Sequence, residues 1–245
     1  MASLQPMPSV KIDSNLLKQW GKVWLGTTSS GANPKTKNCF DKKQGMDFSK
    51  AVIDPAVADA LSVMLGGIPI KDPESSNSLL PPDPDCIELG NTRIIGGVRP
   101  QNFDLAYRPD GVRIAYDSKT LNDAESIKKN WQNMINDLAT EATTVHIRFP
   151  YALVIFVVVV PKQALQASQE FDLIRTLERL ALRKNVQDQP HLAEAIPLIV
   201  WDAEKGEISQ SVPAASSHIR IEKLSEIINP IYLERYKGLP PHSRS

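Results

Sequence analysis

The chain has 245 residues, of which 42% are hydrophobic and 23% are charged, a composition typical of a folded globular protein and unlike a disordered or fibrous one. Its 28 Lys and Arg residues balance 28 Asp and Glu residues, which argues against a histone-like or arm-like polybasic binder and against an acidic disordered tail. The longest apolar run, Tyr151–Val160, is about half of the ~20 residues that a membrane-spanning helix needs.

The N-terminus and the cysteines predict a compartment. Met1–Val10 has neither the positive segment nor the apolar segment of a signal peptide. Cys39 and Cys86 are too few for a disulfide framework. We therefore expect a reduced, cytoplasmic protein without a membrane partner.

The neutral total conceals an uneven distribution of charge. Residues 1–50 contain eight basic and three acidic side chains, whereas residues 51–92 contain one basic and seven acidic ones. Four of the lysines lie in or near the Gly/Ser/Asn/Pro-rich segment Gly26–Gln44: Lys35, Lys37, Lys42 and Lys43. A solvated loop is the favoured interpretation of this segment, and an arm that contacts phosphates is the alternative.

The first half of the chain predicts helices followed by a β-hairpin. Helical spacing covers Ser14–Leu25 behind a Ser14 cap, and Asp54-Pro55 begins a second helix that ends near Gly66-Gly67. The proline-rich segment Lys71–Cys86 predicts a loop. Strand-like residues then follow over three stretches: Ile87–Gly90, Thr92–Val98 and Asn102–Tyr107. The turn Arg108–Gly111 comes next, and the strand Val112–Ser118 follows that turn.

The second half alternates helices and strands. An apolar stripe predicts a helix over Ala124–Ala142, and Val145–Pro161 has the continuous apolar character of a strand buried on both faces. A helix over Phe171–Leu182, a strand over Ile196–Trp201 and a helical segment over Ile219–Tyr236, broken at Pro230, complete the chain. The order predicts an α/β fold with a mixed sheet flanked by helices. We expect one domain over residues 1–245, with a core at about 85–205 and a helical region at about 1–84.

Ionisable residues gather on the hairpin. Asp117 and Lys119 are two residues apart on one strand, so they share a face. If Tyr107 pairs with Val112 across the turn, Asp104 lies opposite Ala115 and diagonal to Asp117, on the same side. Two close carboxylates repel each other unless a cation joins them.

This cluster predicts a divalent-metal site. Mg²⁺ prefers oxygen ligands and needs only one or two carboxylates from the protein. A bound Mg²⁺ would polarise a phosphoryl oxygen, and Lys119 would orient the attacking water or stabilise developing charge. The structural alternative is an exposed Asp117–Lys119 pair, with Asp104 as a solubilising charge at the edge of the strand.

Asp104, the hairpin, Asp117-Ser118-Lys119, the following helix and the buried strand together resemble the PD-(D/E)XK nuclease superfamily, most closely its type II restriction endonucleases. The resemblance covers about Glu88–Val160. It implies a restriction-endonuclease-like mixed-sheet core, Asp104 and Asp117 as metal-binding acids, and Lys119 as the catalytic lysine. Glu88 is a further candidate ligand of the metal.

The chain departs from the pattern of that superfamily at two positions. Phe103 stands where proline is usual, and the second acid is Asp117 instead of the commoner glutamate. A literal Pro109-Asp110 also occurs, but Asp110 lies in the turn, with too little strand left before Asp117 to bring the two side by side.

Residues near Asp104 supply candidate DNA contacts. Arginine commonly contacts guanine, and asparagine or glutamine contacts adenine. The candidates are polar residues that precede Asp104 or lie on the hairpin: Arg93, Arg99, Gln101, Asn102, Arg108 and Arg113.

The function expected from the resemblance is a Mg²⁺-dependent endodeoxyribonuclease that cuts double-stranded DNA, most closely a sequence-specific restriction enzyme. Recognition of a palindrome would favour a homodimer. The alternatives are a repair or recombination nuclease of the same fold and a non-catalytic module that binds DNA or protein.

Overall fold

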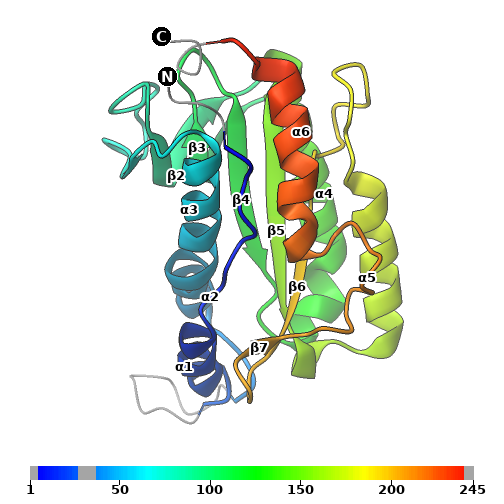
Figure 1. The fold of residues 1–245 in the computed structure, drawn as a ribbon. Coiled ribbons are helices and arrows are strands. Elements are labelled where there is room, and N and C mark those ends of the chain that lie inside the picture. Colours follow the sequence, from blue (N-terminus) through cyan, green and yellow to red (C-terminus); the bar gives the residue numbers. More distant parts are fainter. Residues whose placement is uncertain (1–4, 27–36, 240–245) are drawn as a thin grey trace.

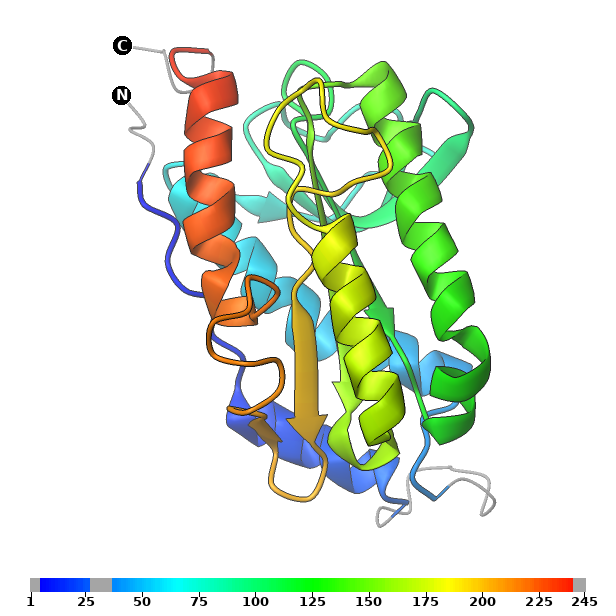
Figure 2. The same cartoon turned by 90° about the vertical axis from the view of Figure 1, so that its right-hand side faces the viewer.

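The computed structural model describes residues 5–26 and 37–239. It contains a seven-stranded mixed sheet whose strands are ordered as in the chain, with helices on both faces, which confirms the predicted α/β class (Figures 1 and 2). Strands β2, β3 and β4 are antiparallel, β4, β5 and β6 are parallel, β1 is parallel to β2, and β7 is antiparallel to β6. The strands are β1 Ile70–Lys71, β2 Ile87–Ile95, β3 Pro100–Tyr107, β4 Ile114–Thr120, β5 Leu153–Pro161, β6 Leu198–Asp202 and β7 Glu207–Ile208.

Helices α1, α2 and α3 lie on one side of the sheet, and α4 and α5 lie on the other (Figures 1 and 2). In the described ranges, none of the helices is long and apolar enough to cross a membrane. The helices are α1 Ser14–Trp24, α2 Lys42–Phe48, α3 Asp54–Met64, α4 Ala124–Arg148, α5 Ala167–Leu180 and α6 Leu224–Tyr236, with a π-helical turn at Ser49–Ile53 and 3₁₀ turns at Lys162–Ala164 and Ile221–Lys223.

Strand β5 forms the centre of the core. All nine of its residues are buried, because it pairs with β4 and β6 and helices cover both of its faces. The continuous apolar run therefore predicts a buried strand correctly, but the strand begins at Leu153 and not at Val145. Val145–Arg148 instead completes α4, since a short apolar run fits a buried helix as well as a buried strand.

The N-terminal helices differ from the prediction in one respect that concerns the site. Helix α1 begins at Ser14 as predicted, although Asp13 caps it. Helix α2, the π-helical turn and α3 follow one another without a break, so Lys42–Gln44, at the end of the segment predicted as a loop, is helical. Residues 27–36 of that segment lie outside the described residues. Asp54 consequently lies inside a continuous helical segment, and the predicted cap at Asp54 is wrong.

The hairpin has a longer turn than predicted. Leu105 pairs with Tyr116 and Tyr107 with Ile114, so the predicted pairing of Tyr107 with Val112 is wrong by two residues. The turn is closed by the Arg113 N–H, which donates to the Tyr107 carbonyl at 2.9 Å. A shift of two residues leaves every side chain on its predicted face, because side chains alternate with a period of two.

Two further boundaries differ. The two stretches predicted around Asn91 join into the single strand β2, with a bulge between Leu89 and Thr92. Helix α6 continues through Pro230 and is not broken there.

A buried ion cluster joins distant parts of the chain around Glu194. Its Oε1 accepts from Arg183 Nη1 at 3.0 Å and from Arg235 Nη1 on α6 at 2.7 Å. Its Oε2 accepts from the Val154 N–H at 2.7 Å and lies 3.2 Å from His146 Nε2 on α4. Burial alone would raise the pKa of Glu194, but these partners outweigh it and hold the pKa below its ordinary value. This carboxylate therefore ties α4, β5 and α6 together.

Candidate active site

Strands β3 and β4 separate beside the predicted site. Among the described residues, β3 pairs with β4 only over Leu105–Tyr107, whereas Asp117–Thr120 of β4 pair with β5 alone. The β4 edge that faces away from β5 is therefore free of a strand partner over these four residues. Where the strands separate, Asp104 Oδ2 accepts hydrogen bonds from the Ser118 N–H and from Ser118 Oγ, both at 3.0 Å. A side chain thus takes the place of a strand partner.

Asp104, Asp117 and Lys119 lie together at the point where β3 separates from β4. Asp117 is buried, and its Oδ2 is hydrogen-bonded to the Lys119 ammonium. Burial raises the pKa of Asp117 well above its ordinary value; Lys119 opposes this effect, whereas Asp104 and Glu141 add to it. The carboxyl group of Asp117 is therefore unfavourably placed as an anion unless a further cation joins it.

The Lys119 ammonium lies between two carboxylates. Besides Asp117, it donates to Glu141 Oε1 on α4 at 3.0 Å. Burial by itself would lower the pKa of Lys119, but the two carboxylates outweigh it and raise the pKa above its usual range. Lys119 therefore keeps its proton at neutral pH and acts as a fixed positive charge.

Glu141 is a site residue that the prediction missed. Its side chain is 5% exposed, and its Oε1 accepts from Lys119 and also from Gln101 Nε2 at 3.0 Å. Its Oε2 is buried without a hydrogen-bond partner in the part of the chain that the structure describes. A signal for it exists in the sequence, because Glu141 continues the buried stripe of Met134 and Leu138 at helical spacing. A carboxylate on such a stripe needs a partner.

Asp54 is the second missed residue, and it faces the site from the opposite side of the sheet. Its Oδ1 accepts from the Tyr116 hydroxyl at 2.9 Å. Burial and the nearby Asp104 raise the pKa of Asp54 to about 7, against the opposing effect of Tyr116. In sequence, Asp54-Pro55 reads as a helix cap. The π-helical turn that carries the helix past this point leaves no comparable signal, although such turns often mark functional sites.

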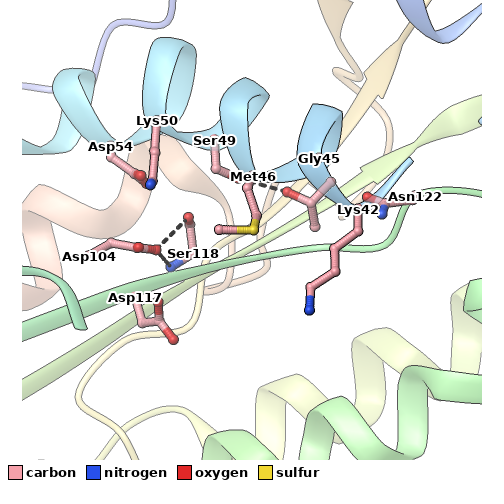
Figure 3. A pocket seen from close by; sticks show the side chains of 11 residues that line it. Lys42, Gly45, Met46, Ser49, Lys50, Asp54, Asp104, Asp117, Ser118 and Asn122 are labelled. Carbon is pink, nitrogen blue, oxygen red and sulfur yellow. Dashed lines mark hydrogen bonds between the residues drawn. The ribbon is translucent and has the colours of Figure 1, made fainter. Parts of the chain in front are cut away.

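Asp54, Asp104 and Asp117 line a cavity of about 310 Å³ (Figure 3). Asp104, Asp117 and Ser118 lie along one side of it, and Lys50 and Asp54 face them from the helical segment. The remaining lining residues are Lys42, Gly45, Met46, Ser49, Thr120 and Asn122. A second cavity of about 280 Å³ shares Lys50, Asp54 and Asp104 with the first.

Glu88 is not part of this cluster. Its side chain is fully buried, and both carboxylate oxygens accept from Arg108, at 2.5 Å from Nε and 2.7 Å from Nη2. The guanidinium therefore occupies the positions that a metal would need, and the assignment of Glu88 as a ligand is corrected.

Two of the predicted DNA contacts are also buried. The Arg108 side chain is 5% exposed and holds Glu88. The Arg113 side chain is 1% exposed, donates to both oxygens of Asp110 and lies over the Tyr236 ring at 4.9 Å. Neither guanidinium is available to a phosphate or a base, so both are corrected to fold-stabilising residues.

The other four candidates lie along β2, β3 and the turn between them. Arg93 and Asn102 are half-buried and hydrogen-bonded to each other at 3.3 Å. Gln101 is half-buried and directed to Glu141 on α4. Of these four, Arg99 alone is exposed to solvent.

The donor set fits a hard divalent cation. Asp104 and Asp117 present carboxylate oxygens to the cavity. The pKa values of Asp117 and Asp54 are raised mainly by burial and further by the neighbouring Asp104, so a bound cation would stabilise the ionised form of both groups. Within the described ranges, no group of three or more His, Cys, Asp and Glu side chains is arranged as a metal site. Mg²⁺ does not require one, because it binds through one or two carboxylates and retains several waters.

No protein-family model, curated protein or solved structure matches the chain. The function of the protein is therefore inferred from the geometry of its site and from the motif that the site residues form.

Proposed function

We propose that this protein is a Mg²⁺-dependent endonuclease that hydrolyses phosphodiester bonds in double-stranded DNA. The observation that supports this proposal is the convergence of Asp104, Asp117 and Lys119 where β3 separates from β4. The two acids stand on adjacent strands, and the ammonium is held beside one of them at a free strand edge that a substrate can reach.

Each residue has a chemical role in the hydrolysis. Asp104 and Asp117 would hold the cation, which when bound neutralises them and polarises a phosphoryl oxygen. Lys119, fixed and protonated, orients the attacking water and stabilises the charge that grows on the phosphoryl oxygens. The water oxygen forms a bond to phosphorus and gives up a proton to solvent, while the bond from phosphorus to one bridging oxygen breaks and that oxygen takes up a proton from solvent. One new DNA end carries a phosphate monoester and the other a hydroxyl group.

Incubation with DNA tests the proposal directly. An amplified, unmethylated DNA mixture of high sequence complexity is expected to be cut in the presence of Mg²⁺ and to remain intact with EDTA. Discrete fragments would support a sequence-specific restriction enzyme, and a continuous distribution of lengths would support a repair or recombination nuclease. If this DNA stays intact at several Mg²⁺ concentrations, the proposed activity is wrong.

We favour the restriction enzyme among the nucleases, on the resemblance of Asp104 and Asp117-Ser118-Lys119 to that group. Such an enzyme would be expected to bind a short palindrome as a homodimer, because the symmetry of the site matches that of the protein. Sedimentation velocity would test the dimer.

A non-catalytic binding module is the second candidate, and the full pairing of Lys119 with two carboxylates favours it. In a purely structural role, these ion pairs would only anchor α4 to the sheet. The variant Asp104→Asn distinguishes the two candidate functions. It would abolish cleavage by a nuclease, whereas it would leave the binding activity of a non-catalytic module unchanged.

Glu141 is expected to position Lys119. Glu141→Gln should lower kcat by about 10-fold. Residues that hydrogen-bond to a group at the reacting centre and orient it typically change activity by about 10–100-fold when they are replaced. The affinity for DNA should not change, since Glu141 is 5% exposed. Single-turnover cleavage and DNA titration separate the two quantities.

The matched control is Glu125→Gln on the same helix. Glu125 forms an exposed ion pair with Lys129 at 2.9 Å, and its replacement should leave cleavage unchanged. Equal cleavage by Glu141→Gln and the wild type would contradict the positioning role.

A further inference from the structure

The free edge of β4 forms the floor of a groove. The cavity of about 310 Å³ lies on the α2 side of this edge, and a cavity of about 390 Å³ lies on its α4 side. Ser118 and Thr120 line both cavities. The two cavities therefore meet along the same stretch of strand, beside Asp104 and Asp117.

The helical segment Lys42–Asp54 forms one wall of this groove. Ser49 Oγ lies 2.8 Å from Thr120 Oγ1, which fixes the π-helical turn against β4. At the other end, a Cβ on Gly45 would lie 2.5 Å from Asn122 Oδ1, so a larger residue there would require the Asn122 side chain to move. The wall therefore lies close to β4 and to the residues that follow it.

Among the described residues, two lysines of this wall form no ion pair. Lys42 and Lys50 line the cavity, are exposed and form no ion pair within the part of the chain that the structure describes (Figure 3). Lys43, between them in sequence, does not line the cavity and is paired with Asp47 at 2.5 Å. Among the described residues, the two lysines that line the cavity therefore have no carboxylate within ion-pair distance, although Lys50 lies near enough to Asp54 to oppose the rise in the pKa of that carboxyl group.

We propose that Lys42 and Lys50 bind backbone phosphates of a DNA strand that lies along the free edge of β4. Eight helical residues span about 12 Å. At a rise of about 3.4 Å per nucleotide along the duplex axis, a distance of this length parallel to the axis corresponds to about three or four nucleotides. Lys50, which lines the cavity with Asp54 and Asp104, would contact a phosphate near the cleaved bond, and Lys42 would contact one farther along.

Charge also favours this assignment. Three carboxylates and two ammonium groups line the cavity: Asp54, Asp104, Asp117, Lys42 and Lys50. With a divalent cation the sum becomes positive, so the cavity attracts a polyanion. The inference rests on the proposed function, since it places the same substrate at the same site. Lys42 and Lys50 would thus take the role of phosphate contacts that was predicted for Arg108 and Arg113, which are buried.

The salt dependence of DNA binding tests the inference. Binding of a labelled duplex is measured by fluorescence anisotropy in EDTA and in Ca²⁺, over about 50 to 200 mM salt. Lys42→Ala and Lys50→Ala are each expected to reduce the slope of log K against log [salt] by about 0.9 and to weaken binding about 5- to 10-fold at about 0.1 M salt. Lys42→Arg and Lys50→Arg should restore the wild-type slope.

Lys43→Ala is the matched control and should leave the slope unchanged, because its ammonium is already paired. A double variant Lys42→Ala/Lys50→Ala that binds with the wild-type slope would overturn the inference, and it would leave the proposed function intact if the wild type cuts DNA. A wild type that shows the lysine-dependent slope but never cuts DNA would support the inference and overturn the nuclease. A wild type that neither binds nor cuts duplex DNA would overturn both.

Discussion

Asp117→Asn is expected to lower Mg²⁺-dependent cleavage of DNA by about 10³-fold and to leave the protein folded. The loss is expected because the amide removes one of the two negative charges that would hold the cation, and removal of one electrostatic contributor to catalysis typically costs about 10²–10³-fold. Initial rates at saturating Mg²⁺, compared with those of the wild type, measure the effect.

The same substitution should not lower thermal stability. The pKa of Asp117 is higher in the folded protein than in the unfolded chain, so its ionised carboxylate opposes folding at neutral pH. An amide removes this opposition, and Lys119 keeps its contact with Glu141. A loss of activity with an unchanged or raised Tm is therefore the expected pair of results, as for groups retained for function at the expense of stability.

Asp59→Asn provides the control, since Asp59 is exposed on α3 and outside the cavity. It should retain both activity and Tm. Normal cleavage by Asp117→Asn would refute the site, whereas a large fall in its Tm would show that the carboxylate is structural.

Glu194→Gln is expected to reduce the free energy of unfolding by about 3–5 kcal/mol. Removing one partner of a buried ion pair costs this much because the remaining charge is left without compensation, and here Arg183 and Arg235 both depend on Glu194. Urea denaturation at about pH 7 measures the difference. Glu226→Gln, which breaks an exposed pair with Lys223, should cost less than about 1 kcal/mol.

The effect of Glu194→Gln should depend on pH in a defined direction. The pKa of Glu194 is lower in the folded protein than in the unfolded chain, where it is about 4.3. Its stabilising contribution is therefore complete above the unfolded value and is lost as the pH falls through the folded one. The stability of the wild type should approach that of the variant below about pH 4. A gap that stays constant down to about pH 3 would contradict an ionic origin.

The position of the three principal site residues could be predicted from the sequence because they depend on local pattern. Strand alternation placed Asp117 and Lys119 on one face, and the turn at Arg108–Gly111 brought Asp104 beside them. The predicted register was wrong, yet the error of two residues preserved the faces. It also concealed that Asp104 lies level with Asp117, one residue beyond the last pair of the ladder.

The contributions of Asp54 and Glu141 depend on tertiary packing and could not be derived in the same way. Asp54 reaches the site because the π-helical turn at Ser49–Ile53 continues the helix past a residue that resembles a cap. Glu141 reaches Lys119 because α4, the helix that connects β4 to β5 in the chain, packs against the sheet beside Lys119. Arg108 and Glu88 illustrate the opposite case. Glu88 on β2 and Arg108, directly after β3, are polar residues that form a buried ion pair.

The free stretch of β4 has a consequence for solubility. An unpaired strand edge offers its backbone N–H and C=O groups to the strands of other molecules, and proteins commonly protect such edges with charged side chains. Asp117 and Lys119 stand on this edge, and the Asp104 carboxylate occupies the Ser118 N–H. The groups proposed for DNA cleavage thus also block edge-to-edge aggregation, so apolar replacements here should promote self-association where Asp117→Asn does not.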